Sequence, residues 1–418
     1  MGTSATKAQK FTDMDDASPF QTVASLPIPL RHAQCVVHKH EILICGGYNH
    51  NVCYSYHTVK NQYKRICSYP KYLELTGHYV VRHVTSDSKN DKEILLLSFG
   101  QSGYEKKYIL AMRYISVWEK DKNKKLKNKH NKWQFLTDNN DQAITIVGNE
   151  DNFVGARATI GGENKHLLFI TYYPNNISVY NLNTWQYVKH ATLPVDSILI
   201  SHCFVSKNHK KKKSSEMMLF NQRVGLSIEY DEDNNVFNFQ KVRVCKTIGQ
   251  LCFYGYVCVN NSILFFGGKN GRGATVNEVY QYSISDDKWT KYEQTLPMAL
   301  RDCTVVLSDD NAFVHIIGGF DGENKLAIHM KADVKNWIRG EQQLMIEDQE
   351  IVDIEKIHME LEGMNHDLDI KKLKVLQFQN CSKQKEIEKI IEYWMRSSSI
   401  NKMGWIPDFN FIVLRYIL

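Results

Sequence analysis

Short apolar runs of strand length recur along the chain, and most of them end at glycine. The runs are EILICGG ending at Gly47, EILLLSFG at Gly100, HLLFITYY at Tyr173, EMMLF at Phe220, SILFFGG at Gly268 and FVHIIGG at Gly319. Consecutive apolar positions are expected of strands that are buried on both faces. The first and last runs end about 270 residues apart over five intervals, or about 54 residues per unit. This spacing predicts six repeats, each the size of a four-stranded sheet with its loops.

Two further registers repeat with the same period. An aromatic residue or Met precedes another aromatic residue by seven positions, as Tyr56/Tyr63, Tyr230/Phe237, Tyr282/Trp289 and Met330/Trp337. We expect each pair to bury a large area between adjacent sheets, near the end of the third strand and the start of the fourth. In addition, LPIPLR (Leu26–Arg31) recurs as LPMALR (Leu296–Arg301).

These registers together resemble the kelch repeat. The pattern is most complete in Gly267-Gly268, Tyr282, Trp289, Leu296-Pro297 and Arg301. It covers about residues 20 to 338 and is weakest in units three and four, which lack Gly-Gly after the second strand. The resemblance, to the galactose oxidase/kelch-type propellers, implies an all-β propeller of about six four-stranded antiparallel blades. It implies loops that bind other proteins, and no reaction.

The blade cores are predicted at about 31 to 69, 77 to 137, 153 to 190, 200 to 241, 252 to 292 and 302 to 338. A closed ring needs an outer strand for its last blade, because an unpaired strand edge invites aggregation. The segment from Phe20 to Ser25 resembles the fourth strands that begin at Trp185 and Trp289, so we expect it to supply this strand. Trp337, which also begins a fourth strand by the seven-residue rule, is the alternative.

The composition changes after Trp337. Leu344, Ile351, Ile354 and Leu361 fall on one helical stripe. We therefore expect three segments: a flexible N-terminal segment over 1–18, the propeller over 19–338 and a small α-helical domain over 339–418. The helical extension resembles no type that we recognise.

Net charge is concentrated in two loops. The formal charge is +6, but 120–132 holds seven Lys and 207–213 holds five, so the rest of the chain is slightly acidic. By the alternation of loops in an antiparallel blade, both runs leave the same face. They are either solvated insertions or a basic patch for anionic lipid, RNA phosphate or nuclear import. The candidate lysines are Lys122, Lys124, Lys125, Lys127, Lys210, Lys211, Lys212 and Lys213.

The opposite face carries the loops that follow each second strand. These loops mix aromatic residues with Asn, Gly and Arg, a composition suited to adaptable contacts around aromatic anchors. We predict that this face binds a protein, with Tyr48, Tyr104, Arg272 and Phe320 as contacts. The alternative is a set of ordinary tight turns.

Motifs for chemistry are not found in the sequence. There is no P-loop, H-E-x-x-H or G-x-S-x-G motif, and the ten cysteines have no zinc spacing. We therefore expect no cofactor, no metal and mostly buried reduced thiols. Asp-rich spots after Tyr230, Ser285 and Ser308 are expected at turns.

The N-terminal residues predict where the protein acts. They contain no apolar stretch of signal-peptide length, and no apolar run approaches a membrane span, so we expect a cytoplasmic protein. Gly2 fits the N-myristoylation pattern, which by itself gives only marginal membrane binding.

The sequence thus predicts a non-catalytic protein–protein interaction scaffold with unidentified protein partners. An adaptor is one form that such a scaffold can take. Specific nucleic-acid recognition, a small-molecule substrate and membrane contact are not expected. Two alternatives stay open: a propeller-based enzyme or carbohydrate-binding module, and a membrane or RNA tether through the lysine-rich loops.

Overall fold

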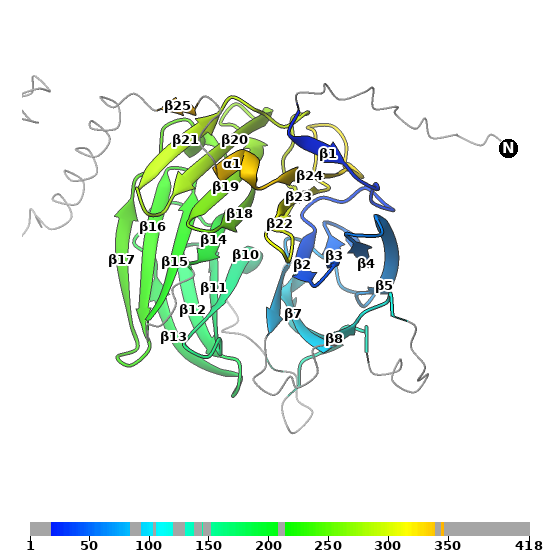
Figure 1. Ribbon diagram of the computed structural model, residues 1–418. Coiled ribbons are helices and arrows are strands. Elements are labelled where there is room, and N and C mark those ends of the chain that lie inside the picture. The colour runs from blue at the N-terminus through cyan, green and yellow to red at the C-terminus, as the bar shows by residue number, and fades with distance from the viewer. Residues whose placement is uncertain are drawn as a thin grey trace, which may run out of the picture. The chain divides into compact units, whose positions relative to one another are not determined.

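The computed structural model describes residues 18–83, 93–102, 106–119, 130–137, 144, 152–207, 214–338 and 344–346. The strands in these ranges form six antiparallel sheets, which are the blades of a β-propeller (Figure 1). The sequence prediction of an all-β propeller with four-stranded blades is confirmed.

The strands run outward from the axis in chain order within each blade. Blade 1 has β2 (Gln34–His38), β3 (Glu41–Gly47), β4 (His50–His57) and β5 (Gln62–Ser68). Blade 2 has β6 (Tyr79–His83), β7 (Glu93–Ser102), β8 (Lys106–Ile115) and β9 (Gln134–Phe135). Blade 3 has β10 (Asn152–Gly161), β11 (Leu167–Tyr173), β12 (Asn176–Asn181) and β13 (Gln186–Thr192).

The remaining blades follow the same plan, apart from their outermost strands. Blade 4 has β14 (Cys203–Ser206), β15 (Ser214–Asn221), β16 (Val224–Asp231) and β17 (Val236–Val242). Blade 5 has β18 (Gly255–Val259), β19 (Ser262–Lys269), β20 (Thr275–Ser283) and β21 (Lys288–Tyr292). Blade 6 has β22 (Thr304–Leu307), β23 (Phe313–Ile317) and β24 (His329–Asp333). These bounds lie within a few residues of the predicted blade cores.

Each second strand supplies side chains to two blade interfaces. In β3, Leu43 and Cys45 pack toward blade 2, whereas Ile42 and Ile44 pack toward blade 6. Successive side chains of a strand point to opposite faces, so a strand buried on both faces loses its polar alternation. The result is six apolar cores, one between each pair of neighbouring blades.

The Gly-Gly pairs lie where the chain that enters the next blade crosses the end of the second strand. Gly268 N donates to Leu300 O at 2.8 Å, and Gly319 N donates to Leu30 O at 2.7 Å. A Cβ on the preceding glycine would lie only 2.0 Å from Leu300 O in blade 5 and 2.4 Å from Leu30 O in blade 6. The glycines are therefore required by a close backbone approach to the leucine of each LPxxLR segment.

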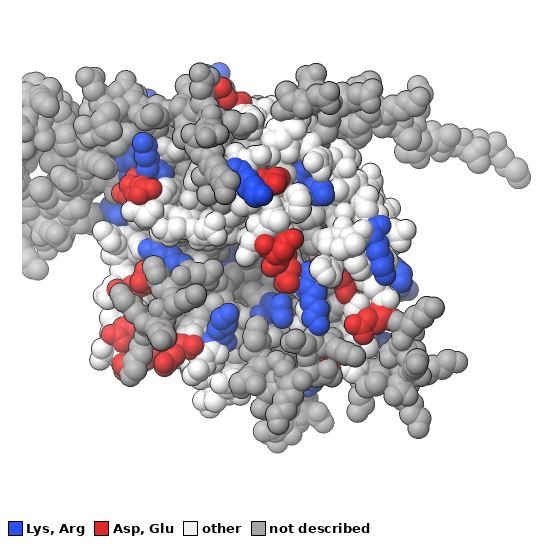
Figure 2. Space-filling model, viewed as in Figure 1, with Lys and Arg blue, Asp and Glu red and all other residues white. Residues whose placement is uncertain are grey.

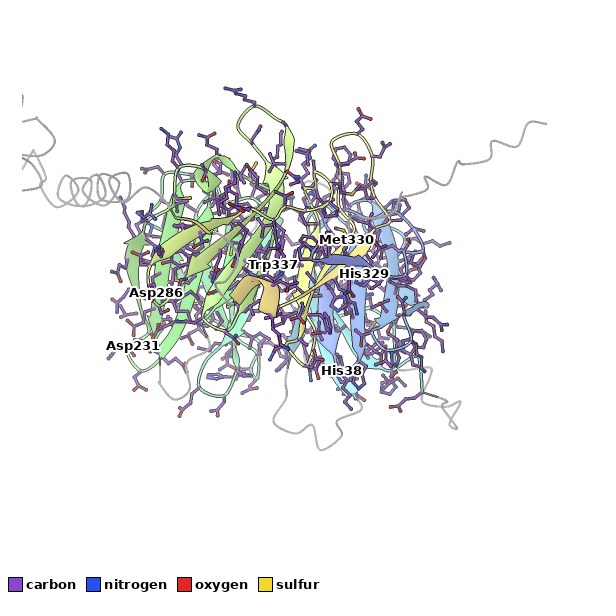
Figure 3. The ribbon with its side chains drawn as sticks, turned by 45° about the horizontal axis from the view of Figure 1, so that its top comes forward. His38, Asp231, Asp286, His329, Met330 and Trp337 are labelled. Carbon is purple, nitrogen blue, oxygen red and sulfur yellow. The ribbon has the colours of Figure 1, made fainter. Side chains whose placement is uncertain are left out.

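The ring is closed by the N-terminal strand. Strand β1 (Phe20–Thr22) pairs antiparallel with β24 as the outer strand of blade 6, with Phe20 opposite Ala332 and Thr22 opposite Met330. The predicted closing segment is confirmed, and Figure 3 shows His329 and Met330 on the strand beside it. The alternative is wrong, because Trp337 lies in the short helix α1 (Lys335–Ile338).

Trp337 nevertheless takes part in closure. Its ring centroid lies 5.5 Å from that of Phe20 and 5.8 Å from that of Phe266, so it packs between blades 5 and 6. The other seven-residue pairs are cross-strand neighbours as predicted, with Tyr282 opposite Trp289, for example. The Met330/Trp337 pair is not, since the chain is helical by residue 335.

The predicted helical domain over 339–418 lies almost entirely outside the described residues. Strand β25 (Leu344–Ile346) is the part that the structure describes, and it pairs antiparallel with β21 as a fifth strand of blade 5. The prediction that Leu344 begins a helical stripe is therefore wrong. Leu344–Ile346 are extended because their main chain pairs with the free edge of β21, although the spacing of apolar residues in this segment favours a helix.

Deletion of residues 1–27 should strongly destabilise the protein. It removes β1, the buried Phe20 ring and the buried Leu26, and it leaves the β24 edge unpaired. Loss of one buried Phe costs about 3–5 kcal/mol on its own. Thermal unfolding followed by circular dichroism should therefore show a much lower Tm. A matched deletion of residues 1–17 retains β1 and should leave the Tm unchanged; equal Tm values for the two deletions would contradict the closure described here.

Candidate functional site

Two kinds of loop form one face of the propeller, called here the b–c face. They are the loops that join the second and third strands of a blade and the loops that join one blade to the next. The predicted partner-binding loops belong to this face. Of the lysine-rich runs, the structure describes Lys132 and Lys207, and Lys207 Nζ lies 3.6 Å from Glu216 Oε2. The eight candidate lysines lie outside the described residues, so their predicted position on the other face stays a prediction.

Six residues with left-handed backbone encircle the axis just before or within the inner strands. One comes from each blade, and their φ values lie between 50° and 81°. They are His32, Gly77, Gly155, Ser201, Phe253 and Asp302. Left-handed backbone is uncommon for residues other than glycine, and such residues cluster at functional sites.

Backbone hydrogen bonds connect this ring from blade to blade. His32 N donates to Asp302 O at 2.9 Å and Asp302 N to Phe253 O at 2.8 Å, while Ser201 N donates to Gly155 O at 3.0 Å. A Cβ on Gly77 would lie 2.7 Å from Gly155 N, so glycine is needed where the strands approach most closely. The ring holds the side chains of its other members at the mouth of the central channel.

A cavity of about 110 Å³ lies beneath the ring. His32, Ser201, Phe253 and Asp302 contribute to its lining from the ring. The inner strands contribute polar side chains to the wall, and these are Gln34, Tyr79, Arg157, Tyr256 and Thr304. Tyr79 and Tyr256, which come from opposite blades, both line this wall.

The ionisable groups around the cavity differ in charge. Burial raises the pKa of Asp302 to about 6, against the opposing charges of Arg301 and Arg31. Burial lowers the pKa of His78 to about 4 and, together with the charge on Arg157, lowers that of His202 well below its usual value. At neutral pH the histidines are therefore uncharged, Arg157 is a cation and Asp302 is mostly an anion.

Two of the four predicted contact residues come together beside this cavity. The Arg31 guanidinium lies 4.3 Å from the ring centroid of Tyr48 and 5.1 Å from that of Phe320, and Arg301 lies 4.9 Å from the Phe320 ring. Arg31 and Arg301 occupy the same position of the two LPxxLR segments, a repeat that is visible in the sequence. Sequence reasoning noted this repeat but did not assign a role to its arginines.

The other predicted residues are placed differently. Arg272 is exposed in the neighbouring loop, where Thr275 Oγ1 lies within 3.4 Å of the Cβ position of Gly322. Tyr104 and Gly2 lie outside the described residues. Where Figure 2 shows described side chains, Lys and Arg are interspersed with Asp and Glu.

Sequence reasoning missed the exposed apolar side chains of the b–c face. Tyr72, Tyr173, Ile198 and Ile200 belong to this face, and they are half of the exposed large apolar residues of the described structure. In sequence, Ile198 and Ile200 lie at the predicted start of the blade 4 core, at about residue 200, and no role was assigned to them. Only the structure shows that they lie in a loop between blades 3 and 4.

The other predicted features are structural where they are described. Asp231 accepts a hydrogen bond from Asn234 N at 3.0 Å, and Asp286 accepts one from Ser283 Oγ at 2.6 Å, so both order turns at the ends of blades (Figure 3). The nine cysteines within the described ranges are free thiols, and six of them are buried. The part of the chain that is described contains no cluster of three metal-ligating side chains. No helix in it is long and apolar enough to cross a membrane.

Comparison with known proteins agrees with the geometry. The family model described as Kelch motif matches residues 250–293, which form most of blade 5. No curated protein matches the chain. A solved structure titled "Structure of YjhT" is similar over 78% of this chain and 99% of that chain, with a TM-score of 0.52 and 11% identity. At this identity the similarity concerns the fold alone.

Acidification below pH 6.5 should destabilise the protein. The pKa values of His78, His202, His315 and His329 are all lowered by burial, so the unfolded chain binds more protons than the native one below pH 6.5. The free energy of unfolding should decrease as the pH is lowered, by up to about 1.4 kcal/mol per pH unit for each histidine. The pKa of Asp302 is raised, so this group acts in the opposite direction, but the histidines with lowered pKa values, which also include His32, His38 and His83, outnumber it.

Urea unfolding at pH 7.5, 6.5 and 5.5 would measure this dependence. His202→Gln should reduce the slope by removing one titrating group. A free energy of unfolding that is constant between pH 7.5 and 5.5 would show that these histidines are not held neutral.

Proposed function

We propose that the chain, which is a kelch-repeat β-propeller, is a non-catalytic scaffold that binds a partner protein through its b–c face. The observation that carries the proposal is the group of exposed apolar side chains on this face. Tyr173, Ile198 and Ile200 expose 38%, 52% and 43% of their surface. Exposed apolar side chains that gather on one surface are typical of protein interaction sites.

The backbone that carries these three side chains is ordered by hydrogen bonds. Leu199 N donates to Pro174 O at 2.8 Å, which joins the loop after Tyr173 to the loop of Ile198 and Ile200. Asn221 Nδ2 donates to Ile198 O at 2.9 Å from blade 4. The apolar side chains are thus held in place before binding, which reduces the entropy that association costs.

This apolar group adjoins the central ring. Ile200 Cγ2 lies 3.2 Å from the position that a Cβ on Gly155 would occupy, so it is beside the channel mouth. Arg31 lies in the loop that leads into blade 1, and Arg301 lies in the loop that leads into blade 6. Phe320, which both arginines contact, follows the second strand of blade 6. A partner that spans the mouth would meet apolar contacts over blades 3 and 4 and stacked arginines over blades 6 and 1.

Arginine and aromatic residues are the residue types that most often dominate binding energy in protein interfaces. Tyr48, Tyr104, Arg272 and Phe320 therefore remain our proposed contacts, with Arg31 and Arg301 added to them. In the described structure Tyr48 and Phe320 are only partly exposed, because the arginines cover their rings. Their contribution to binding would come through these stacked pairs.

The partner surface can be tested with two matched variants. Tyr173→Ser, Ile198→Ser and Ile200→Ser combined should abolish partner capture, since buried apolar anchors carry much of an interface. Val59→Ser with Val236→Ser removes two exposed apolar side chains of the opposite face, one in the turn between β4 and β5 and one at the start of β17, and should leave capture unchanged. Both are compared with the full-length wild type by affinity purification, mass spectrometry and, for each protein recovered, direct binding of the purified pair.

Equal loss in both variants, or no loss in either, would contradict the proposed surface. If no protein is retained and a small molecule co-purifies instead, the scaffold function itself is wrong.

A further inference from the structure

The guanidinium of Arg157 lies in the central cavity and forms no ion pair with a described residue, although its charge acts on the carboxyl of Asp302 in the same cavity. Arg157 is only 9% exposed. Among the described residues, no carboxylate oxygen lies within 4.0 Å of its guanidinium nitrogens. Its Nη1 donates to Ala156 O at 3.0 Å and to Gly155 O at 3.5 Å, both next to it in the chain. Burying a charge is costly unless it is paired, so an arginine in this state is suited to a ligand of opposite charge.

The rest of the cavity holds this side chain in a defined position. The guanidinium lies 5.5 Å from the ring centroid of Tyr79, and Tyr256 lines the cavity from the opposite blade. The side chain of Gln34, 9% exposed, also lines the cavity and offers an amide donor. The volume of about 110 Å³ is several times that needed by one water molecule, so a group of about four heavy atoms fits.

We propose that this cavity binds a single carboxylate group, which pairs with the guanidinium of Arg157. Arginine matches the planar geometry of a carboxylate with paired N–H donors. The carboxylate belongs either to a free small acid or to an acidic side chain of a bound polypeptide. The proposal does not depend on the proposed partner surface, because a free acid can occupy the cavity alone.

Asp302 sets a limit on this site. Its carboxylate lines the same cavity and would repel an incoming anion, but it already faces His32 Nε2 at 3.1 Å and Arg31 Nη1 at 4.0 Å. Asp302→Asn removes the negative charge and retains a side chain that tolerates the left-handed backbone at this position. The two charges of the cavity should therefore act on binding in opposite directions.

Calorimetric titration of the full-length protein with acetate, at pH 7 and constant ionic strength with chloride as the reference anion, tests the site. We expect a Kd on the order of 1 mM, as befits a ligand of four heavy atoms. Arg157→Gln should weaken acetate binding at least about tenfold. Asp302→Asn should strengthen it several-fold, and Lys71→Gln, which removes an exposed cation from a loop of the same face, should leave it unchanged.

Further comparisons cover the remaining outcomes. Acetamide, which has the shape of acetate without its charge, should not bind. If Arg157→Gln does not fold, Arg157→Lys, which keeps the charge but loses the paired donors, should still weaken acetate binding. Binding of N-acetyl-aspartate amide as well as acetate would assign the site to a carboxylate on a polypeptide, and binding of acetate alone would assign it to a free acid.

The proposal is overturned if neither carboxylate binds the wild type more tightly than acetamide, or if the Arg157 variants bind acetate as the wild type does. The combined Tyr173, Ile198 and Ile200 variant should retain acetate binding. A failure of the partner surface and a failure of this site are therefore distinguishable.

Discussion

Every blade of this protein has two apolar faces, and no blade can bury both without a neighbour on each side. The inner and second strands carry almost continuous apolar residues, and alternate side chains enter alternate interfaces, as Leu43 and Ile44 do in β3. Because burial of apolar surface is the main favourable contribution to folding, the stability of each blade is shared with the next. The six interfaces therefore depend on one another, and the ring depends on the contact between its first and last blades.

Much of this architecture could be predicted because repetition amplifies weak local signals. Gly267-Gly268 and the LPxxLR leucines are recognisable in sequence because a backbone contact between successive blades demands them. Trp337 satisfied the same spacing rule and yet lies in a helix, since β1 had already taken the strand position beside β24. Strand competition of this kind depends on residues more than three hundred positions apart, which no local pattern contains.

The candidate site was predicted only in part, for a physical reason. Its ring is defined by backbone conformation, and residues as different as His32, Ser201, Phe253 and Asp302 share that conformation. Arg157 reads as one polar residue within a strand, and only the convergence of the blades places it in the wall of the central cavity. The b–c face was predicted from loop composition, but no role was predicted for Ile198 and Ile200. The repeat pattern therefore predicts the blades, whereas the residues of the candidate site do not follow the repeat and could not be predicted from it.

The pairing of β1 with β24 also has a consequence for the order of events during synthesis. Phe20 emerges from the ribosome more than three hundred residues before its partner Ala332. Until β24 has been synthesised, β1 has no partner strand, and long-range pairings of this kind form slowly. Blades 1 to 5 can pack on one another as they are synthesised, but the ring closes only when β1 pairs with β24, which is synthesised much later.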